Sequence, residues 1–252
     1  MQNLVQDVRH AFRQLSKSPT FATTALLTLA VGIGANVVVF GVVNALLLNP
    51  FPIPHPEQVY SVQQRAAEAV NSSYPVYLDL RDRGTVFSGL AATRVARIGL
   101  EASNVAQPVW GYEVTGNYFD TLGVRPVLGR FLSASDEYGD HANEVVVLSY
   151  GAWKARFDGD QKIVGKTVRV NKHPYTVIGV APRGFQGTEK IFWPEVWLPL
   201  LNEAQIEGYN WIRQRNDYNS WVVGRLKPGT TPTQAEAARA QKQSRRYYRE
   251  KE

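Results

Sequence analysis

The segment that most resembles a phosphate-binding motif extends from Gly159 to Thr167 and ends in Gly-Lys-Thr. A phosphate-binding loop has four residues between its glycines, followed by Lys and then Ser or Thr at the start of a helix. Here five residues separate Gly159 from Gly165, and residues 167–180 have the pattern of strands. The run therefore predicts turn glycines, and a nucleotide-dependent enzyme is the least favoured interpretation.

Metal and nucleophile chemistry is no better supported. The acidic cluster of Asp136, Glu137 and Asp140 lacks the alternating ligands of a calcium loop, which favours a solvated acidic turn. The chain has no Cys and no serine-hydrolase or zinc-protease motif. We therefore expect no catalytic residue, cofactor or metal site, and interpret the protein as a non-enzyme. Four histidines show no metal-ligand spacing: His10, His55, His141 and His173.

The net charge of +6 belongs to the two ends of the 252-residue chain. Residues 1–19 carry a net charge of +2 and residues 239–252 one of +4, while the 19 basic and 19 acidic residues between them cancel. A nucleic-acid-binding domain carries its basic patch on the folded body, so we expect no nucleic-acid partner. The composition is 44% hydrophobic and 20% charged, which excludes a disordered or collagen-like chain.

A long uncharged segment predicts a transmembrane helix. No charged residue occurs between Ser18 and Pro56, and Phe21–Leu48 is almost continuously apolar or small over 28 residues. About 20 residues are enough to cross a bilayer. A cleaved signal peptide is disfavoured, because its apolar part spans only about 7–15 residues. We therefore expect an uncleaved anchor, with a helix over residues 20–48.

The distribution of Lys and Arg predicts the orientation of this anchor. Three basic residues precede the span, whereas the first one after it is Arg65. The positive-inside rule then places the N-terminus in the cytoplasm and the main domain outside. Residues 1–19 have an amphipathic pattern and predict an interfacial helix on the cytoplasmic face, ended by Ser18-Pro19.

The span also carries candidates for packing against other membrane helices. Small residues recur at a spacing of four, which lets helices approach closely in lipid. The general abundance of Gly in membrane helices explains this spacing of small residues equally well. Two Asn side chains favour a polar partner on another helix. The candidates are Ala30, Gly34, Asn36, Gly41, Asn44 and Ala45.

The residues after the span predict an α+β domain that is rich in strands in its middle. Alternating prolines over residues 50–56 predict a stiff, extended exit from the bilayer. The predicted strands are 58–62, 108–115, 144–149, 167–170, 175–180 and 220–226. The predicted helices are 73–83, with Ser73 as N-cap, 118–123, 150–157 and 233–252. Residues 171–174 are expected to form a hairpin turn.

One aromatic segment is a candidate contact surface. The six Trp residues are spread along the chain, and most are expected in the core. Residues 192–197 instead combine Phe192, Trp193 and Trp197 within six positions, so they are a candidate site for a partner or for the membrane surface.

Ordered blocks stand along residues 1–238: Asp7–Phe21, Leu29–Asn36, Asn117–Phe131, Val146–Trp153, Arg156–Gly159, Val164–Lys166, Val177–Pro182 and Gly224–Gly229. Together these blocks resemble permeases of the MacB/FtsX type, and in particular a group of duplicated permeases of acidobacteria. This resemblance implies one membrane helix leading to a MacB-like periplasmic core domain over residues 49–238. It also implies porter-like halves at about 57–115 and 205–238, with an inserted strand-rich subdomain at about 116–204.

The same resemblance implies a function in transport. Members of this family couple ATP hydrolysis by a separate cytoplasmic ABC ATPase to movements outside the membrane, in efflux or export, and they assemble with further permease helices as oligomers. Residues 239–252 form a basic tail that departs from the family pattern, so the chain is expected to be a truncated permease. The alternative is a single-span, membrane-anchored binding module without an ATPase partner.

Overall fold

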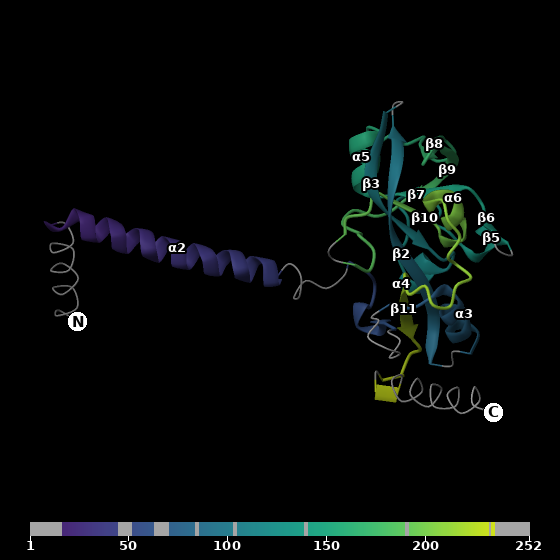
Figure 1. Ribbon diagram of the computed structural model, residues 1–252, viewed down its shortest axis with the longest axis horizontal. Helices are drawn as coiled ribbons and strands as arrows, with labels where there is room; N and C mark the ends of the chain where they lie inside the picture. Colours follow the sequence, from purple (N-terminus) through teal and green to yellow (C-terminus); the bar gives the residue numbers. More distant parts are fainter. Residues whose placement is uncertain are drawn as a thin grey trace. The chain divides into compact units, whose positions relative to one another are not determined.

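The computed structural model describes residues 17–44, 52–62, 71–83, 86–102, 105–138, 141–189, 192–231 and 233–234. The chain divides into two compact units, Met1–Pro50 and Phe51–Glu252 (Figure 1). Three predictions fall outside the described residues: most of the interfacial helix of residues 1–19, the packing role of Ala45, and the C-terminal helix with its basic tail.

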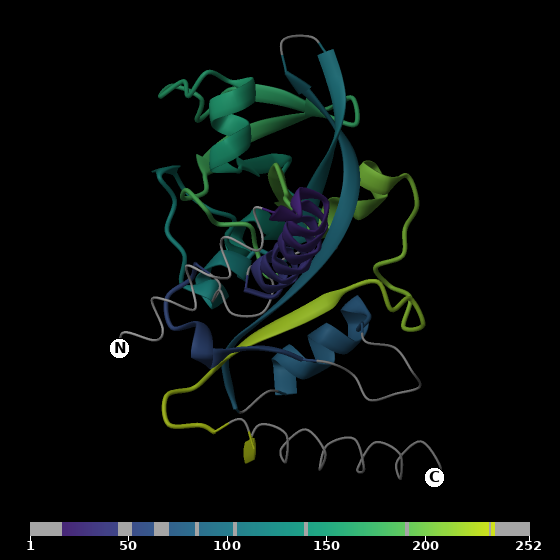
Figure 2. The ribbon, with the colours of Figure 1, turned by 90° about the vertical axis from the view of Figure 1, so that its left-hand side faces the viewer.

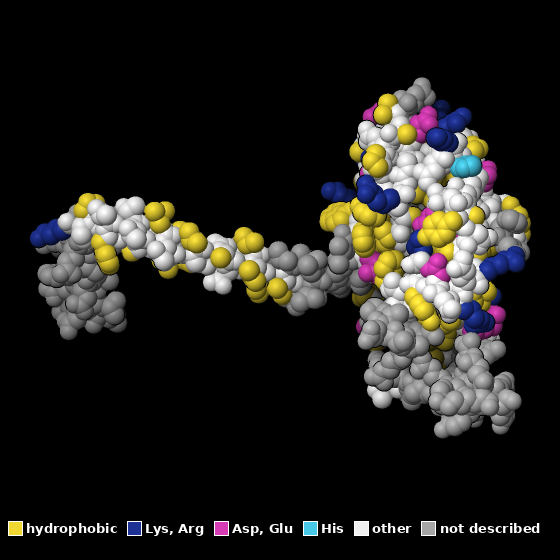
Figure 3. Space-filling view, viewed as in Figure 1, with side chains coloured by type: hydrophobic (Ala, Val, Ile, Leu, Met, Phe, Trp, Pro, Cys, Tyr) yellow, Lys and Arg dark blue, Asp and Glu magenta, His cyan; other side chains and the backbone are white. Residues whose placement is uncertain are grey.

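The first unit contains helix α2, Pro19–Val43. Proline at its first position fits a helix start, because the N–H that proline lacks has no partner there. Within it, Pro19–Gly41 has a mean hydropathy of 1.9 and is long and apolar enough to cross a membrane. Figure 3 shows hydrophobic side chains distributed along this helix. The prediction of one apolar N-terminal helix is confirmed, and the helix starts one residue before the predicted residue 20.

Three threonines show how this helix accommodates polar side chains. The hydroxyl of Thr23 donates to the carbonyl of Pro19 at 2.9 Å, and Thr24 and Thr28 bond in the same way four residues back. Each hydroxyl proton is thus satisfied within the helix, as a hydrocarbon environment requires.

The second unit is built on a nine-stranded mixed sheet. The strand order is β1-β11-β2-β3-β10-β7-β9-β4, and β8 pairs with both β2 and β9. The strands are β1 Val59–Ser61, β2 Phe87–Ala102, β3 Val105–Val114, β4 Leu128–Gly129, β7 Val145–Leu148, β8 Thr167–Val170, β9 His173–Val180, β10 Val196–Pro199 and β11 Trp221–Leu226.

Six of these strands close into a barrel. The successive pairs are β2–β3, β3–β10, β10–β7, β7–β9, β9–β8 and β8–β2, so the last strand returns to the first. Alternate residues of β2 (Ile98, Leu100) and of β10 (Val196, Leu198) belong to one buried cluster. Because alternate residues of a strand share a face, this cluster is the barrel interior.

The long strand β2 joins the barrel to a flatter, two-sided layer. Its first half pairs with β11, which pairs with β1, and Figure 2 shows β2 crossing the unit from end to end. Helix α4, Tyr118–Leu122, packs with Ala91 and Val223 on one face of this layer. Helix α3, Tyr74–Arg83, contributes to the cluster on the opposite face, with Leu90 and Val222.

Short elements complete the fold. They are η2 Pro56–Gln58, η3 Ala134–Asp136, η4 Leu200–Asn202, α5 Tyr150–Arg156, α6 Glu203–Glu207 and the β5–β6 hairpin of Glu137–Tyr138 and His141–Ala142. The α+β prediction is confirmed. The division into porter-like halves (57–115 and 205–238) and an inserted subdomain (116–204) stays a prediction. Strands from all three of these segments share one hydrogen-bonded sheet.

Two local predictions need correction. The hairpin turn is shorter than expected: Asn171 and Lys172 alone form it, with φ of 46° and 74°, while His173 and Pro174 belong to β9. Ser73 directly precedes α3, but its buried hydroxyl has no hydrogen-bond partner, so its side chain does not cap the helix.

Candidate functional site

The glycine-flanked run contains turns. Gly159 and Gly165 have φ of 65° and 88°, and Thr167 begins strand β8 instead of a helix. Lys166 is paired with Asp160 at 2.5 Å. The interpretation as turn glycines is confirmed, and the geometry offers no helix N-terminus for a phosphate.

The acidic cluster is structural, so the expected solvated turn is wrong for Asp136. This carboxylate is 2% exposed and accepts two hydrogen bonds of 2.7 Å from Arg130 and one of 3.0 Å from the Ser133 N–H. Burial alone would raise the pKa of Asp136, but these hydrogen bonds lower it to about 2. Asp140 lies outside the described residues. Over the described ranges, no group of three or more His, Asp or Glu side chains could hold a metal ion.

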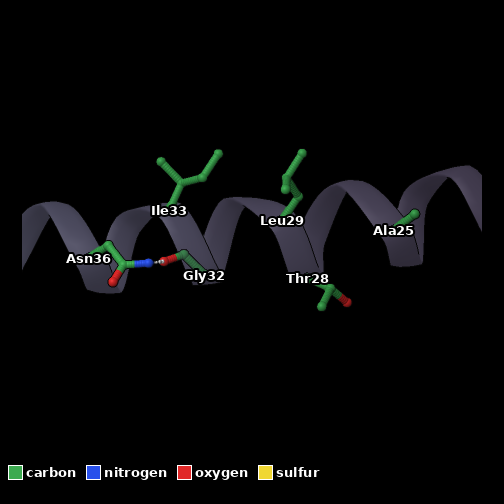
Figure 4. Close-up of a pocket in the computed structure, with 6 residues that line it drawn as sticks. All are labelled: Ala25, Thr28, Leu29, Gly32, Ile33 and Asn36. Atoms are coloured by element: carbon green, nitrogen blue, oxygen red, sulfur yellow. Dashed lines mark hydrogen bonds between the residues drawn. The ribbon is translucent and has the colours of Figure 1, made fainter.

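A groove runs along one side of the candidate transmembrane helix α2. It is lined by Ala25, Thr28, Leu29, Gly32, Ile33 and Asn36. Figure 4 shows the Asn36 amide bonded along the helix to the Gly32 carbonyl, at 3.0 Å. One N–H of this amide is used inside the helix, which leaves its carbonyl oxygen and second N–H for a partner.

The packing candidates divide between two sides of α2. At 100° per residue, Ala30, Gly34 and Gly41 lie within an arc of about 40°, and Asn36 lies about 140° from its centre. A Cβ built on Gly34 or Gly41 meets no atom within 4 Å, so both positions leave open surface. Asn44, at the helix C-cap, lies between the two sides.

The aromatic segment separates into exposed and buried parts. Trp193 is 69% exposed, and the half-buried ring of Phe192 lies 5.2 Å from that of Trp110. Trp197 is fully buried against Phe119 and Phe185, so its expected role in a partner surface is wrong.

Two residues of this surface were missed from the sequence. Trp110 is 40% exposed, and the guanidinium of Arg97, its cross-strand neighbour, lies 5.3 Å from its ring. The usable signal was strand alternation, since Trp110 lies between Val109 and Gly111, which are both buried and face the other side of β3. We call Trp110, Phe192, Trp193 and Arg97 the aromatic patch.

A buried ionisable cluster also escaped sequence reasoning. Arg94 of β2 pairs with Glu207 at 2.7 Å and lies 3.9 Å from Glu113 and 4.4 Å from the Trp211 ring. Neither carboxylate oxygen of Glu113 has a hydrogen-bond partner. Burial raises the pKa of Glu113 well above its ordinary value; Glu207 and Glu203 raise it further, and Arg94 opposes them. This cluster ties β2 and β3 to α6.

These features define the class: an α+β domain that follows a candidate transmembrane helix. The model of the MacB-like periplasmic core domain family matches residues 22–242, so the chain belongs to this family. A curated relative, the macrolide export ATP-binding/permease protein MacB of Aggregatibacter actinomycetemcomitans, is 44% identical over 69 residues. That match covers 27% of this chain and 10% of the relative.

Solved structures share the fold. The periplasmic region of MacB from Actinobacillus actinomycetemcomitans has a TM-score of 0.54 at 21% identity, covering 71% of this chain and 78% of that one. A domain of a putative permease from Porphyromonas gingivalis has a TM-score of 0.55 at 17% identity, covering 77% and 86%. The extracellular domain of the ABC-type transporter YknZ from Gram-positive bacteria has a TM-score of 0.50 at 16% identity, covering 71% and 86%.

Proposed function

We propose that this chain is a non-catalytic permease component of an ABC-type efflux or export system. In this proposal its extracytoplasmic domain is coupled to a separate cytoplasmic ATPase, which supplies the energy. The observation that carries the proposal is the family match over residues 22–242, which joins the apolar helix and the α+β domain in one unit of homology. The curated relative, an export ATP-binding/permease protein, supports the same function.

The proposed topology follows from charge. Residues 1–19 lie at the cytoplasmic face, residues 20–48 cross the bacterial inner membrane, and residues 49–238 form the periplasmic domain. Basic residues Arg9, Arg13 and Lys17 before the span support this orientation, because they are held on the cytoplasmic side.

The proposed partners inside the membrane are other permease helices, in an oligomeric complete system. Ala30, Gly34, Gly41 and Ala45 would admit one close neighbour, and Asn36 and Asn44 would bond to polar groups of others. Outside the membrane, Phe192 and Trp193 are the proposed partner contact, extended by Trp110. Large aromatic side chains with a cation beside them are typical of protein contact surfaces.

Capture of the ATPase tests this proposal. The tagged full-length chain is cross-linked in membranes of its native host, purified, and its partners are identified by mass spectrometry. An ABC ATPase should be recovered with the parent chain and reduced by Gly34→Ile, which blocks the close helix contact. Val39→Ile, on another side of α2, is the matched control and should retain it.

Recovery of no ABC ATPase by the well-expressed parent chain would overturn the permease proposal. A soluble periplasmic ligand recovered instead would favour the anchored binding module.

A further inference from the structure

A cleft in the second unit lies apart from the aromatic patch and from the buried ionisable cluster. It has a volume of about 630 Å³ and opens between helix α3 and the segment 201–215, with η3 and β5 at one end. Small-molecule sites in proteins commonly have volumes of about 300–1,000 Å³. The cleft is therefore large enough for an organic ligand.

Apolar side chains form one part of this cleft. Leu78 of α3 is half-buried, and Leu201 and Ile212 are 7% and 4% exposed. All three pack in or against the cluster that holds α3 on the sheet. This surface is fixed by the fold, so an apolar ligand group placed on it would lose little of its binding energy to rearrangement.

Three arginines line the cleft beside this apolar surface: Arg81, Arg213 and Arg215. Arg81 is held by Asp82 at 2.9 Å, and Arg215 by Asp79 at 2.8 Å. Neither aspartate lines the cleft. A guanidinium has five N–H donors, so the ion pair with Asp82 orients Arg81 without using all of them.

Among the described residues that line the cleft, Glu137 carries the single carboxyl group. It accepts a hydrogen bond of 2.8 Å from the Gly116 N–H. Burial raises the pKa of Glu137, so its neutral form persists to a higher pH than for an exposed Glu. The described side chains that line the cleft thus include three guanidinium groups and one carboxyl group.

We propose that this cleft binds an amphipathic organic anion. The apolar part of the ligand lies on Leu78, Leu201 and Ile212, and its anionic group is held among Arg81, Arg213 and Arg215. Binding here needs neither an ATPase nor transport, so its failure would leave the proposed permease function intact.

Isothermal titration with a matched pair of probes tests the site. The full chain, in nanodiscs of zwitterionic lipid, is titrated with 2-naphthalenesulfonate and with neutral 2-naphthol, and the heats of empty nanodiscs are subtracted. We expect saturable binding of one sulfonate per chain, and binding of the neutral probe weaker by about tenfold or more, because a charge-assisted hydrogen bond is lost.

Variants assign the binding to this cleft. Arg81→Ala and Arg213→Ala should each weaken sulfonate binding by about tenfold. Ala134→Trp, at an exposed position of the lining, should abolish it by filling the space without removing charge. Arg169→Ala, on strand β8, is the matched control and should change nothing. Thermal unfolding of each variant identifies those that lose the fold, and Ala134→Trp keeps the test independent of the arginines.

Three results would overturn the proposal. They are the absence of saturable sulfonate binding, equal affinity for the two probes, and sulfonate binding with the affinity of the parent chain in folded Arg81→Ala and Ala134→Trp. Loss of binding in Arg97→Ala with these two variants unaffected would also overturn it, because it would assign the anion to the aromatic patch.

Discussion

At the scale of single residues, Glu113 shows that the burial of a side chain can differ from what its local sequence predicts. The sequence predicts a strand over 108–115, in which alternate residues face opposite sides. Both sides of β3 are buried here, since Tyr112 and Val114 join one core cluster and Val109 joins another. A carboxylate between them cannot reach solvent. Which strands cover β3 depends on long-range pairing, so local pattern could not predict this burial.

Glu113 should make the stability of the domain depend on pH. Its folded-state pKa is raised, so the folded protein retains a proton that the unfolded chain has lost. The free energy of unfolding should therefore fall as pH rises from about 4.5 through the raised pKa. In Glu113→Gln this fall should be smaller, because the neutral amide cannot ionise. Urea unfolding of the full chain in detergent between pH 5 and 9, followed by Trp fluorescence, measures both curves.

Asp136 supplies a control of opposite sign. Its pKa of about 2 means that its contribution to stability is present above about pH 4 and is lost as pH falls toward 2. Asp136→Asn should therefore be destabilised at neutral pH, with no change in slope between pH 5 and 9. Parallel curves for the parent chain and Glu113→Gln would contradict the role given to Glu113.

Gly179 tests a close approach of two backbone segments. A Cβ at this position would lie 2.1 Å from the carbonyl oxygen of Arg130 and 3.1 Å from that of Leu128. These atoms belong to the segment that pairs with β9, so they cannot move without loss of that pairing. Gly179→Ala should lower the free energy of unfolding by about 1–3 kcal/mol. The measurement is urea unfolding of the full chain.

Gly151→Ala is the matched control. Its Cβ would meet only the Ser149 hydroxyl at 3.8 Å, within helix α5. Because alanine favours the helix, this variant should be unchanged or stabilised by up to about 1 kcal/mol. Equal destabilisation of the two variants would show that loss of glycine, and not the close approach, is responsible.

At the scale of elements, strands with clear alternation and helices with start signals were predictable. Among the described strands of four or more residues, two were missed, β2 and β10. The predictions for β7, β9 and α5 match the structure within two or three residues at each end. Strand β2 was missed because its Ala, Gly and Arg residues give no alternating pattern. Strand β10 was missed because it has four residues, all buried, beside exposed aromatics. Because exposed aromatic residues stand beside Trp197 in the sequence, it was predicted to be a surface residue.

The β8–β9 hairpin offers an element-scale prediction at Asn171. Its side chain accepts a 2.6 Å bond from the Gly99 N–H and donates a 2.5 Å bond to the Ile206 carbonyl, so the turn is fastened to β2 and α6. Its φ of 46° is also costly for most residues. Asn171→Ala should therefore destabilise the chain by about 2–4 kcal/mol, as measured by urea unfolding.

Asn171→Gly separates the two effects. Glycine accepts the positive φ but makes neither side-chain bond, so it should cost only about 1–2 kcal/mol. If the glycine and alanine variants lose the same stability, the turn conformation contributes nothing measurable.

At the scale of the whole molecule, closure of the barrel was beyond local sequence patterns. The β2–β8 pairing joins Leu100 to Val170 and Glu101 to Arg169, across about seventy residues of chain. No short motif encodes such a partner. The family resemblance did predict the order of span and α+β domain, because it used spaced blocks along most of the chain. The candidate site was predicted only in part: Phe192 and Trp193 are at the surface, while Trp110, Glu113 and the arginine-lined cleft depend on the assembled fold.

The orientation of the chain is a prediction for the whole molecule, and the absence of Cys allows a clean test. Single Cys residues are introduced at Ser16, before the span, and at Val105, which is 58% exposed in the second unit. A membrane-impermeant maleimide applied to intact spheroplasts should label Val105→Cys and spare Ser16→Cys until the membrane is permeabilised. The physical reason is that basic residues before the span are retained in the cytoplasm. Val147→Cys, fully buried, should react only after unfolding. Labelling of Ser16→Cys in intact spheroplasts, with Val105→Cys protected, would reverse the topology and exclude a periplasmic site for the anion-binding cleft.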